Sequence, residues 1–186
     1  MINKTLVCKK KDINLYKFIK DNKIQFELDF NVNNNKILLK NIVNFKLFEL
    51  IAELNKDIID KQIIINSSDN YIDLLIIFNK FSDDLGINKH YYSTKTSKFE
   101  FDNKTVFSSE NIDTDINTNN IDLSEYSLIK DSNNVLEFNY INNHSMNCKY
   151  TFSMILEQDL PSYMENSLGL VMKKVFFRLK TFIENI

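Results

Sequence analysis

The residues that could carry chemistry are few: two histidines, His90 and His144, and two cysteines, Cys8 and Cys148. His144 and Cys148 form a lone H-x3-C pair, whereas a structural metal site needs about four ligands. No local motif presents a nucleophile, although a catalytic triad is assembled in space and has no fixed order in sequence. We therefore expect no metal, no cofactor and no catalytic residue, and we expect both histidines at the surface. An enzyme stays open, but a noncatalytic protein is favoured.

Phosphate-binding and calcium-binding loops are not indicated either. The chain has only two glycines, Gly86 and Gly169, so neither a P-loop nor a dinucleotide fingerprint can be written. The polar stretch 108–124 contains Asp113, Asp115 and Asp122 but lacks the glycine and the terminal glutamate of a calcium loop. We interpret it as an exposed loop.

Nucleic-acid binding has some support in two basic clusters, Lys9-Lys10-Lys11 and Lys173-Lys174 with Arg178. Against it stand a pI near 5.7 and a single arginine, the residue best suited to reading phosphates and guanine edges. A single-strand binder with aromatic stacking platforms stays as a third hypothesis.

Composition indicates a protein that folds on a hydrophobic core, because 44% of the residues are hydrophobic and 26% are charged. The chain is rich in asparagine, isoleucine and lysine, a bias that favours an AT-rich genome as its origin. No apolar stretch near the N-terminus has the length of a signal peptide. We therefore expect an intracellular protein (cytoplasm, nucleus or virion interior) that is not secreted, with two reduced thiols and no membrane span.

The first half of the chain mixes helical and extended patterns. Apolar spacing behind Asp12 predicts a short helix over 12–21, and alternation over 24–30 followed by 37–42 predicts a hairpin. Residues 45–58 predict a helix and 62–65 a buried strand. A cap at 67–69 and an apolar run that stops near Gly86 predict a second helix.

The second half is mostly extended. We predict hairpins over 99–107 and 126–141, a strand over 148–156 with Cys148, Tyr150, Phe152 and Met154 on one face, and a closing amphipathic helix from about Ser162 to Glu184. That helix needs an apolar partner, and the preceding strands are the nearest. The fold class is thus α+β: an antiparallel sheet packed against a long C-terminal helix, with two further helices in the N-terminal half. We expect a single domain over 1–186, with a possible two-part split near 88–98.

Residues 97–186 resemble the close of a START-like helix-grip domain, the SRPBCC class. The resemblance rests on three features in sequence. They are the strand Cys148-Lys149-Tyr150-Thr151-Phe152-Ser153-Met154-Ile155-Leu156, a short connection with Leu160-Pro161, and a long amphipathic helix that ends with Val175-Phe176-Phe177-Arg178-Leu179-Lys180-Thr181-Phe182-Ile183-Glu184. It implies a curved sheet that grips the helix around an apolar cavity for a lipid or another hydrophobic ligand. Residues 36–101 alternatively resemble the β-α-β-α-β-β layout of small sulfur-carrier proteins, without their Cys-Pro pair.

The first functional hypothesis is a noncatalytic binding module whose partner is a hydrophobic small molecule or a protein. The predicted pocket lining comprises Tyr150, Phe152, Met154, Leu168, Met172, Val175, Phe176 and Leu179. The same residues could instead pack on one another as core, whereas a ligand site needs a cavity of several hundred cubic ångströms. The alternative is a structural or assembly subunit of a larger complex, such as a viral or replicon-encoded factor.

Overall fold

The computed structural model describes residues 3–21, 23–79, 89–112, 123–124, 126–130, 133–153 and 162–186, with side chains from 166 onward in the last segment. Its order of elements is β1 (Thr5–Lys10), β2 (Ile13–Lys20), β3 (Lys23–Asn33), α1 (Leu39–Ile42), α2 (Lys46–Leu54), β4 (Ile59–Ser67), β5 (Tyr71–Phe78), β6 (Lys89–Glu100), β7 (Lys104–Asn111), β8 (Tyr126–Leu128), β9 (Asn134–Asn142), β10 (Ser145–Phe152) and α3 (Ser162–Asn185).

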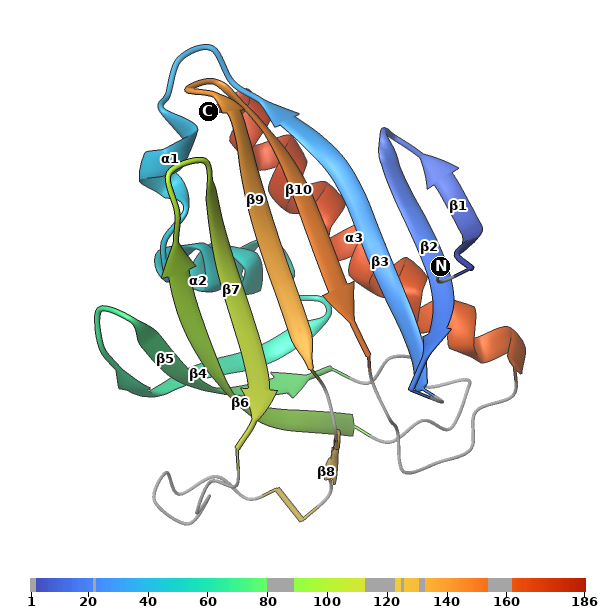
Figure 1. Cartoon of the computed structure of the whole chain (residues 1–186). Helices are drawn as coiled ribbons and strands as arrows, with labels where there is room; N and C mark the ends of the chain where they lie inside the picture. Colours follow the sequence, from blue (N-terminus) through green and yellow to red (C-terminus); the bar gives the residue numbers. More distant parts are fainter. Residues whose placement is uncertain are drawn as a thin grey trace.

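These strands form one sheet with the order β1-β2-β3-β10-β9-β7-β6-β5-β4, and β8 is paired with β6. Every pairing is antiparallel except that of β6 with the short β8. The pairing of β3 with β10 joins the N-terminal strands to the last strand of the chain within the sheet (Figure 1). The α+β class expected from the sequence is confirmed.

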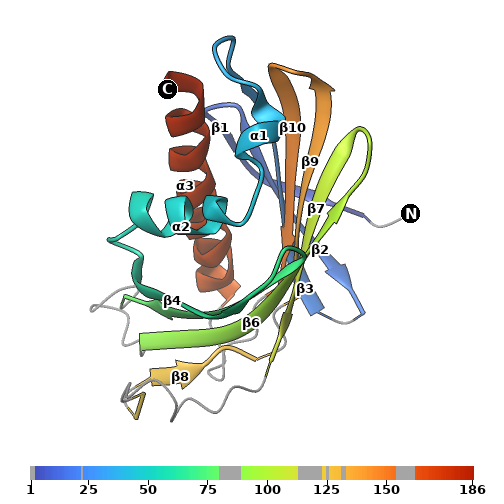
Figure 2. The same ribbon diagram turned by 90° about the vertical axis from the view of Figure 1, so that its left-hand side faces the viewer.

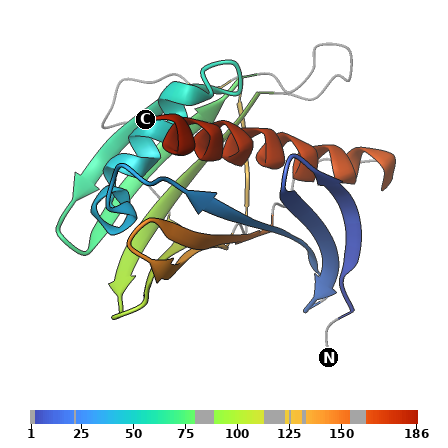
Figure 3. The same ribbon diagram turned by 90° about the horizontal axis from the view of Figure 1, so that it is seen from above.

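All three helices lie on the same side of the sheet, whose surface there we call the inner face. Figure 2 shows that the sheet curves, so that β4 and β6 run beneath α2 and the lower part of α3. Seen from above, α3 passes over this side from the β1–β2 hairpin toward α1 (Figure 3). Among the described residues, none of the helices has the length and apolar character that crossing a bilayer requires.

The helix predicted for 12–21 is wrong, because these residues form strand β2. Lys11 and Asp12 have φ values of 57° and 58°, the left-handed geometry of a tight hairpin turn, so Asp12 turns the chain instead of capping a helix. Ile13 and Leu15 are fully buried, two residues apart on one face. A ten-residue helix is marginal alone, whereas this strand gains hydrogen bonds to both β1 and β3.

Two further expectations for the first half are wrong. Residues 71–78 form strand β5 and not a helix. Leu74, Leu75, Ile76 and Ile77 are all buried, so both faces of the strand are covered. The apolar run therefore lacks the alternation that would distinguish a strand from a helix. Residues 80–88 of that predicted helix lie outside the described residues.

The second strand of the predicted 24–42 hairpin is also absent, because Leu39–Ile42 forms helix α1 and β3 pairs with β2 and β10.

Other expectations are confirmed: α2 lies within 45–58, the hairpin over 99–107 is β6–β7, and the closing helix is α3. The 62–65 segment is a strand, but β4 lies at the edge of the sheet and is largely exposed. The hairpin over 126–141 is wrong, since β8 pairs in parallel with β6 while β9 pairs with β7 and β10. Residues 108–111 of the expected loop continue β7.

Close packing at Gly169 sets how near α3 approaches the sheet. A Cβ atom at this position would lie 2.9 Å from Cδ1 of Phe26 and 3.1 Å from Cδ2 of Leu15. Phe26 is 4% exposed and is stacked on Phe152, with 5.5 Å between ring centroids, so its ring has little room to move. A larger residue would therefore push the helix away from β2 and β3.

We expect Gly169→Ala to lower the free energy of unfolding by about 1–2 kcal/mol, because an overpacking cost of about 1–3 kcal/mol exceeds the helix-propensity gain of about 0.5–1 kcal/mol. Urea unfolding followed by circular dichroism measures this. Ser167→Ala, at an exposed position of the same helix, is the control and should be neutral or stabilising. Stabilisation by both substitutions would contradict the packing argument.

An ion-pair cluster joins α3 to the turn after α2. The Asp57 carboxylate accepts hydrogen bonds from Nη1 and Nη2 of Arg178, and Nζ of Lys174 donates to it at 2.8 Å. The Arg178 guanidinium first and the Lys174 ammonium second hold the pKa of Asp57 well below its usual range. The stabilisation from this ionised carboxylate is thus present above the unfolded-state pKa near 4 and is lost as pH falls through the folded-state pKa.

We expect Asp57→Asn to lower the free energy of unfolding at neutral pH by no more than about 1 kcal/mol, because the side chain is half-exposed. This difference from the unmodified chain should shrink as the pH falls below about 4. Urea titrations at a series of pH values measure it. Glu53→Gln removes a more exposed ion pair with Lys56 and is the control. A difference for Asp57→Asn that persisted unchanged into strong acid would contradict this role.

Candidate ligand-binding site

An aromatic cluster joins α3 to the inner face of the sheet. The ring centroids of Tyr150 and Phe176 are 4.5 Å apart, and those of Tyr150 and Phe152 are 5.1 Å apart. Phe26 stacks on Phe152, and Phe30 lies 6.0 Å from Phe176. These five residues, here called the aromatic cluster, pack beneath α3 from Gly169, which Phe26 contacts, to Phe176.

The predicted lining residues have different surroundings. Tyr150, Phe152, Val175, Phe176 and Leu179 are buried in one hydrophobic core, to which Met172 adds a half-buried side chain. Leu168 is half-buried, one turn before Met172. Met154 lies outside the described residues. The structure thus brings part of the predicted set into direct contact, whereas Leu168 and Met172 keep part of their surface open.

A polar row crosses the inner face next to the aromatic cluster. Antiparallel partners share a face, and Thr96 is opposite Ser109, Ser109 is opposite Asn134, and Asn134 is opposite Phe152. The Thr96 and Ser109 hydroxyl oxygens are 2.8 Å apart and form a hydrogen bond. We call Thr96, Ser109 and Asn134 the polar row.

Asn134 is the member of this row whose hydrogen bonding is incomplete. The residue is 7% exposed, and its side-chain Oδ1 has no hydrogen-bond partner among the described residues. A buried carbonyl oxygen without a donor costs about 1–3 kcal/mol. A bound molecule that donated a hydrogen bond here would remove that cost.

Tyrosines with raised pKa values flank this region. Burial raises the pKa of Tyr92 to about 12 and raises that of Tyr150 well above its usual value. Tyr92 stacks on Phe78 with 5.8 Å between centroids. Both phenols are therefore neutral at physiological pH and add no charge to the inner face.

The expectation that both histidines lie at the surface is wrong, whereas the expectation of two free thiols is confirmed. Both histidines were expected at the surface, but His90 is 1% exposed on the inner face, two residues from Tyr92, and His144 is half-buried. Nδ1 of His144 lies 3.1 Å from the carbonyl oxygen of Asn34 and 2.9 Å from that of Ile37, so this ring joins two turns. Both cysteines are free thiols, as expected.

The polar row was missed by sequence reasoning. Asn134 was part of the predicted 126–141 hairpin and Ser109 part of an expected exposed loop, whereas Thr96 carried no signal. Each residue looks ordinary in its own strand. Only the registers of β6, β7 and β9 place the three side by side.

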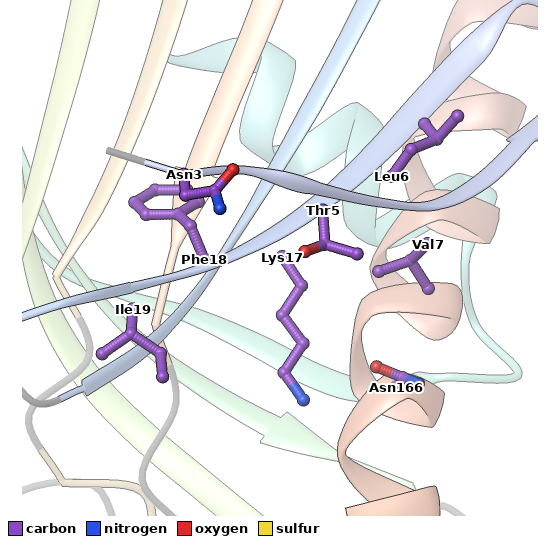
Figure 4. A pocket seen from close by; sticks show the side chains of 8 residues that line it. All are labelled: Asn3, Thr5, Leu6, Val7, Lys17, Phe18, Ile19 and Asn166. Carbon is purple, nitrogen blue, oxygen red and sulfur yellow. The ribbon is translucent and has the colours of Figure 1, made fainter. Parts of the chain in front are cut away.

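A separate groove of about 740 Å³ opens between the β1–β2 hairpin and α3 (Figure 4). Asn166 is its helical residue, and Oδ1 of Asn166 has no hydrogen-bond partner among the described residues. The strand residues that complete the lining are Asn3, Thr5, Leu6, Val7, Lys17, Phe18 and Ile19. None of the seven predicted lining residues that the structure describes lies in this groove.

Solved structures show what this architecture resembles. The human StarD13 (DLC2) lipid transfer and protein localization domain superposes with a TM-score of 0.75 at 5% identity, over 99% of this chain and 90% of that one. Human StAR-related lipid transfer protein 5 gives 0.73 at 10% identity, over 97% and 86%. A STAR-related lipid transfer protein from Xanthomonas axonopodis gives 0.70 at 10% identity, over 95% and 94%. No family model and no curated protein sequence matches the chain.

The chain therefore has the START-like helix-grip fold. The resemblance noted for 97–186 is confirmed and extends over nearly the whole chain. The sulfur-carrier layout for 36–101 is wrong, because it required a helix where β5 lies. Identities this low establish the fold alone.

We expect Asn134→Leu to leave the free energy of unfolding unchanged or to raise it, because the substitution removes a buried oxygen that has no partner. Thr105→Val is the comparison, since the Thr105 hydroxyl is fully buried and forms a 2.9 Å hydrogen bond with the Tyr140 hydroxyl. It should cost about 1 kcal/mol, the typical net value of one such hydrogen bond, because Tyr140 is half-buried. Urea unfolding of the ligand-free protein measures both, and equal losses would show that Asn134 is satisfied.

Proposed function

We propose that this chain is a noncatalytic binding protein that holds a hydrophobic ligand, such as a lipid, between the inner face of the sheet and α3. The observation that carries the proposal is the unpartnered Oδ1 of Asn134, buried beside the apolar wall formed by Phe152 and its neighbours. A wholly apolar core would need no such group, and leaving one there is costly.

The resemblance in fold supports the same proposal. The compared structures from human and Xanthomonas axonopodis are described as lipid transfer proteins or domains. Their fold is shared over nearly all of this chain, so an arrangement that holds a lipid in those proteins is available to this one.

In this proposal the predicted lining residues divide into two groups. Tyr150, Val175, Phe176 and Leu179 act as packed floor, since they are buried against one another and against the sheet. Leu168 and Met172 contact the ligand, because they keep part of their surface open, and Phe152 does so because it is paired with Asn134 across the strands.

The polar row gives the proposed ligand a chemical character. The side chains of Thr96, Ser109 and Asn134 are all uncharged, and the nearby phenol of Tyr92 stays neutral because its pKa is about 12. A charged group would lose its hydration here without gaining a counter-charge from these residues. The ligand is therefore expected to be largely apolar, with an uncharged hydroxyl or amide that donates a hydrogen bond to Asn134.

Native mass spectrometry after incubation with a total lipid extract tests this function. We expect an added mass of one hydrophobic molecule on the unmodified chain. Met172→Trp should abolish most of that added mass by filling the space beside the helix. Ser167→Trp, which places the same bulk on the exposed side of α3, should retain it.

Circular dichroism of both variants establishes that each is folded. Absence of any added mass on the folded, unmodified chain would overturn the proposal, as would equal retention by both tryptophan variants. An added mass that matched a protein chain would instead support an assembly subunit.

A further inference from the structure

A second hollow continues along the seam between β1 and α3. Its volume is about 240 Å³, and we call it the basic pocket; its lining comprises Cys8, Lys10, Lys11, Leu170, Lys173, Lys174 and Phe177. Asn166 of the neighbouring groove, Leu170 and Lys173 follow one another along α3 at helical spacing. The two hollows therefore lie along the same side of the helix.

Lys173 is the buried cation of this pocket. The residue is 8% exposed, and its Nζ donates a hydrogen bond to the Cys8 sulfur at 3.2 Å. None of the ion pairs formed among the described residues includes Lys173. A thiol sulfur is a weak acceptor, so this ammonium is taken out of water with little compensation.

Lys11 brings a second cation to the pocket from an unusual backbone position. It occupies the left-handed region, with φ of 57°, where glycine or asparagine is the usual choice. Nζ of Lys11 lies 4.0 Å from the centroid of the Phe177 ring, so the turn holds this charge over the apolar floor.

Positive charge at the pocket exceeds the nearby negative charge. No carboxylate is among the described residues that line it. Asp57 pairs with Lys174 and also with Arg178, so one carboxylate serves two cations. Lys10, Lys11 and Lys173 have no ion-pair partner among the described residues.

Exposed apolar side chains border this charge along the same seam. Leu170 is 45% exposed in the basic pocket, and Leu6 and Ile19 are 50% and 67% exposed in the neighbouring groove. Lysines next to exposed aliphatic side chains suit the interface of an anionic bilayer, where each cation near the surface contributes about 1 kcal/mol of binding free energy.

We propose that the basic pocket binds the phosphate of an anionic phospholipid head group and docks this edge of the protein on a membrane surface. The phosphate lies near Lys10, Lys11 and Lys173, while Leu170, Leu6 and Ile19 contact the acyl boundary. The pocket lies at the β1 edge and shares no residue with the polar row or the aromatic cluster, so it does not depend on whether a ligand is bound there.

Vesicle flotation tests the docking. The probes are vesicles of phosphatidylcholine alone and vesicles of four parts phosphatidylcholine to one part phosphatidylglycerol, whose only charge is its phosphate. We expect the unmodified chain to bind the second kind and not the first. The double substitution Lys10→Gln with Lys11→Gln should weaken binding by about tenfold or more, following the loss of two cations near the surface.

The matched control is Lys36→Gln with Lys40→Gln, which removes the same net charge from exposed positions near α1. It should bind as the unmodified chain does. Equal weakening in both double variants would overturn the proposal, because net charge alone would then explain binding. No binding to either vesicle by the unmodified chain would overturn it as well.

Cys8 supplies a local readout inside the pocket, because the other thiol, Cys148, is 1% exposed. We expect phosphatidylglycerol vesicles to slow alkylation of Cys8 by N-ethylmaleimide, and phosphatidylcholine vesicles to leave its rate unchanged. Equal protection by inorganic phosphate at the same phosphate concentration would make this a soluble-anion site and overturn membrane docking. Protection by a labelled single-stranded oligonucleotide that the vesicles fail to displace would overturn it in favour of nucleic acid.

Discussion

The contact of α3 with β2 and β3 at Gly169 is the constraint on which the rest of the architecture depends. With no side chain at this point, the helix lies directly against the Phe26 ring and Leu15. Its apolar stripe can then reach the aromatic cluster farther along, where Phe176 meets Tyr150. Because the sheet curves under the helix, one close contact determines how much space is left along the remainder of α3 (Figure 2).

The interior that results has two different parts. Around Tyr150 and Phe176 the side chains are in ring contact, and this part contributes packing energy without leaving room for a ligand. Around Asn134 the buried side-chain oxygen Oδ1 accepts no hydrogen bond from the described residues, and this lowers the stability of the ligand-free protein. A protein that sacrifices stability at one buried point is expected to recover it on binding, which is the physical basis of the proposed ligand site.

The outer edge beside β1 has another electrostatic character. On the inner face the polar row is neutral, and the buried phenol of Tyr92, whose pKa burial raises, adds no charge. Along the seam, lysines from a hairpin turn and from α3 gather around a thiol. The same helix thus separates two environments, one suited to an uncharged apolar molecule and the other to an anionic surface.

The C-terminal third shows how much of this fold local pattern could predict. The alternation of Cys148, Tyr150 and Phe152 and the broad apolar stripe of α3 identified the last strand and helix, because each element buries only one face. The early elements failed for the opposite reason. Strand β5 is buried on both faces, and β2 takes its conformation from two neighbouring strands, so neither shows a pattern of its own.

By itself, the sequence determined that the chain is α+β, has free thiols, and ends in a helix that must cover apolar strands. It also predicted which residues are buried in the packed floor. Val175, Phe176 and Leu179 are apolar at helical spacing, and Tyr150 alternates with polar residues in a strand, so each lies on the buried face of its element. Only tertiary structure decided that Thr96, Ser109 and Asn134 form one row and that Lys11 and Lys173 share a pocket. These residues meet through strand register and helix docking, which depend on contacts between distant segments and leave no local signal in the chain.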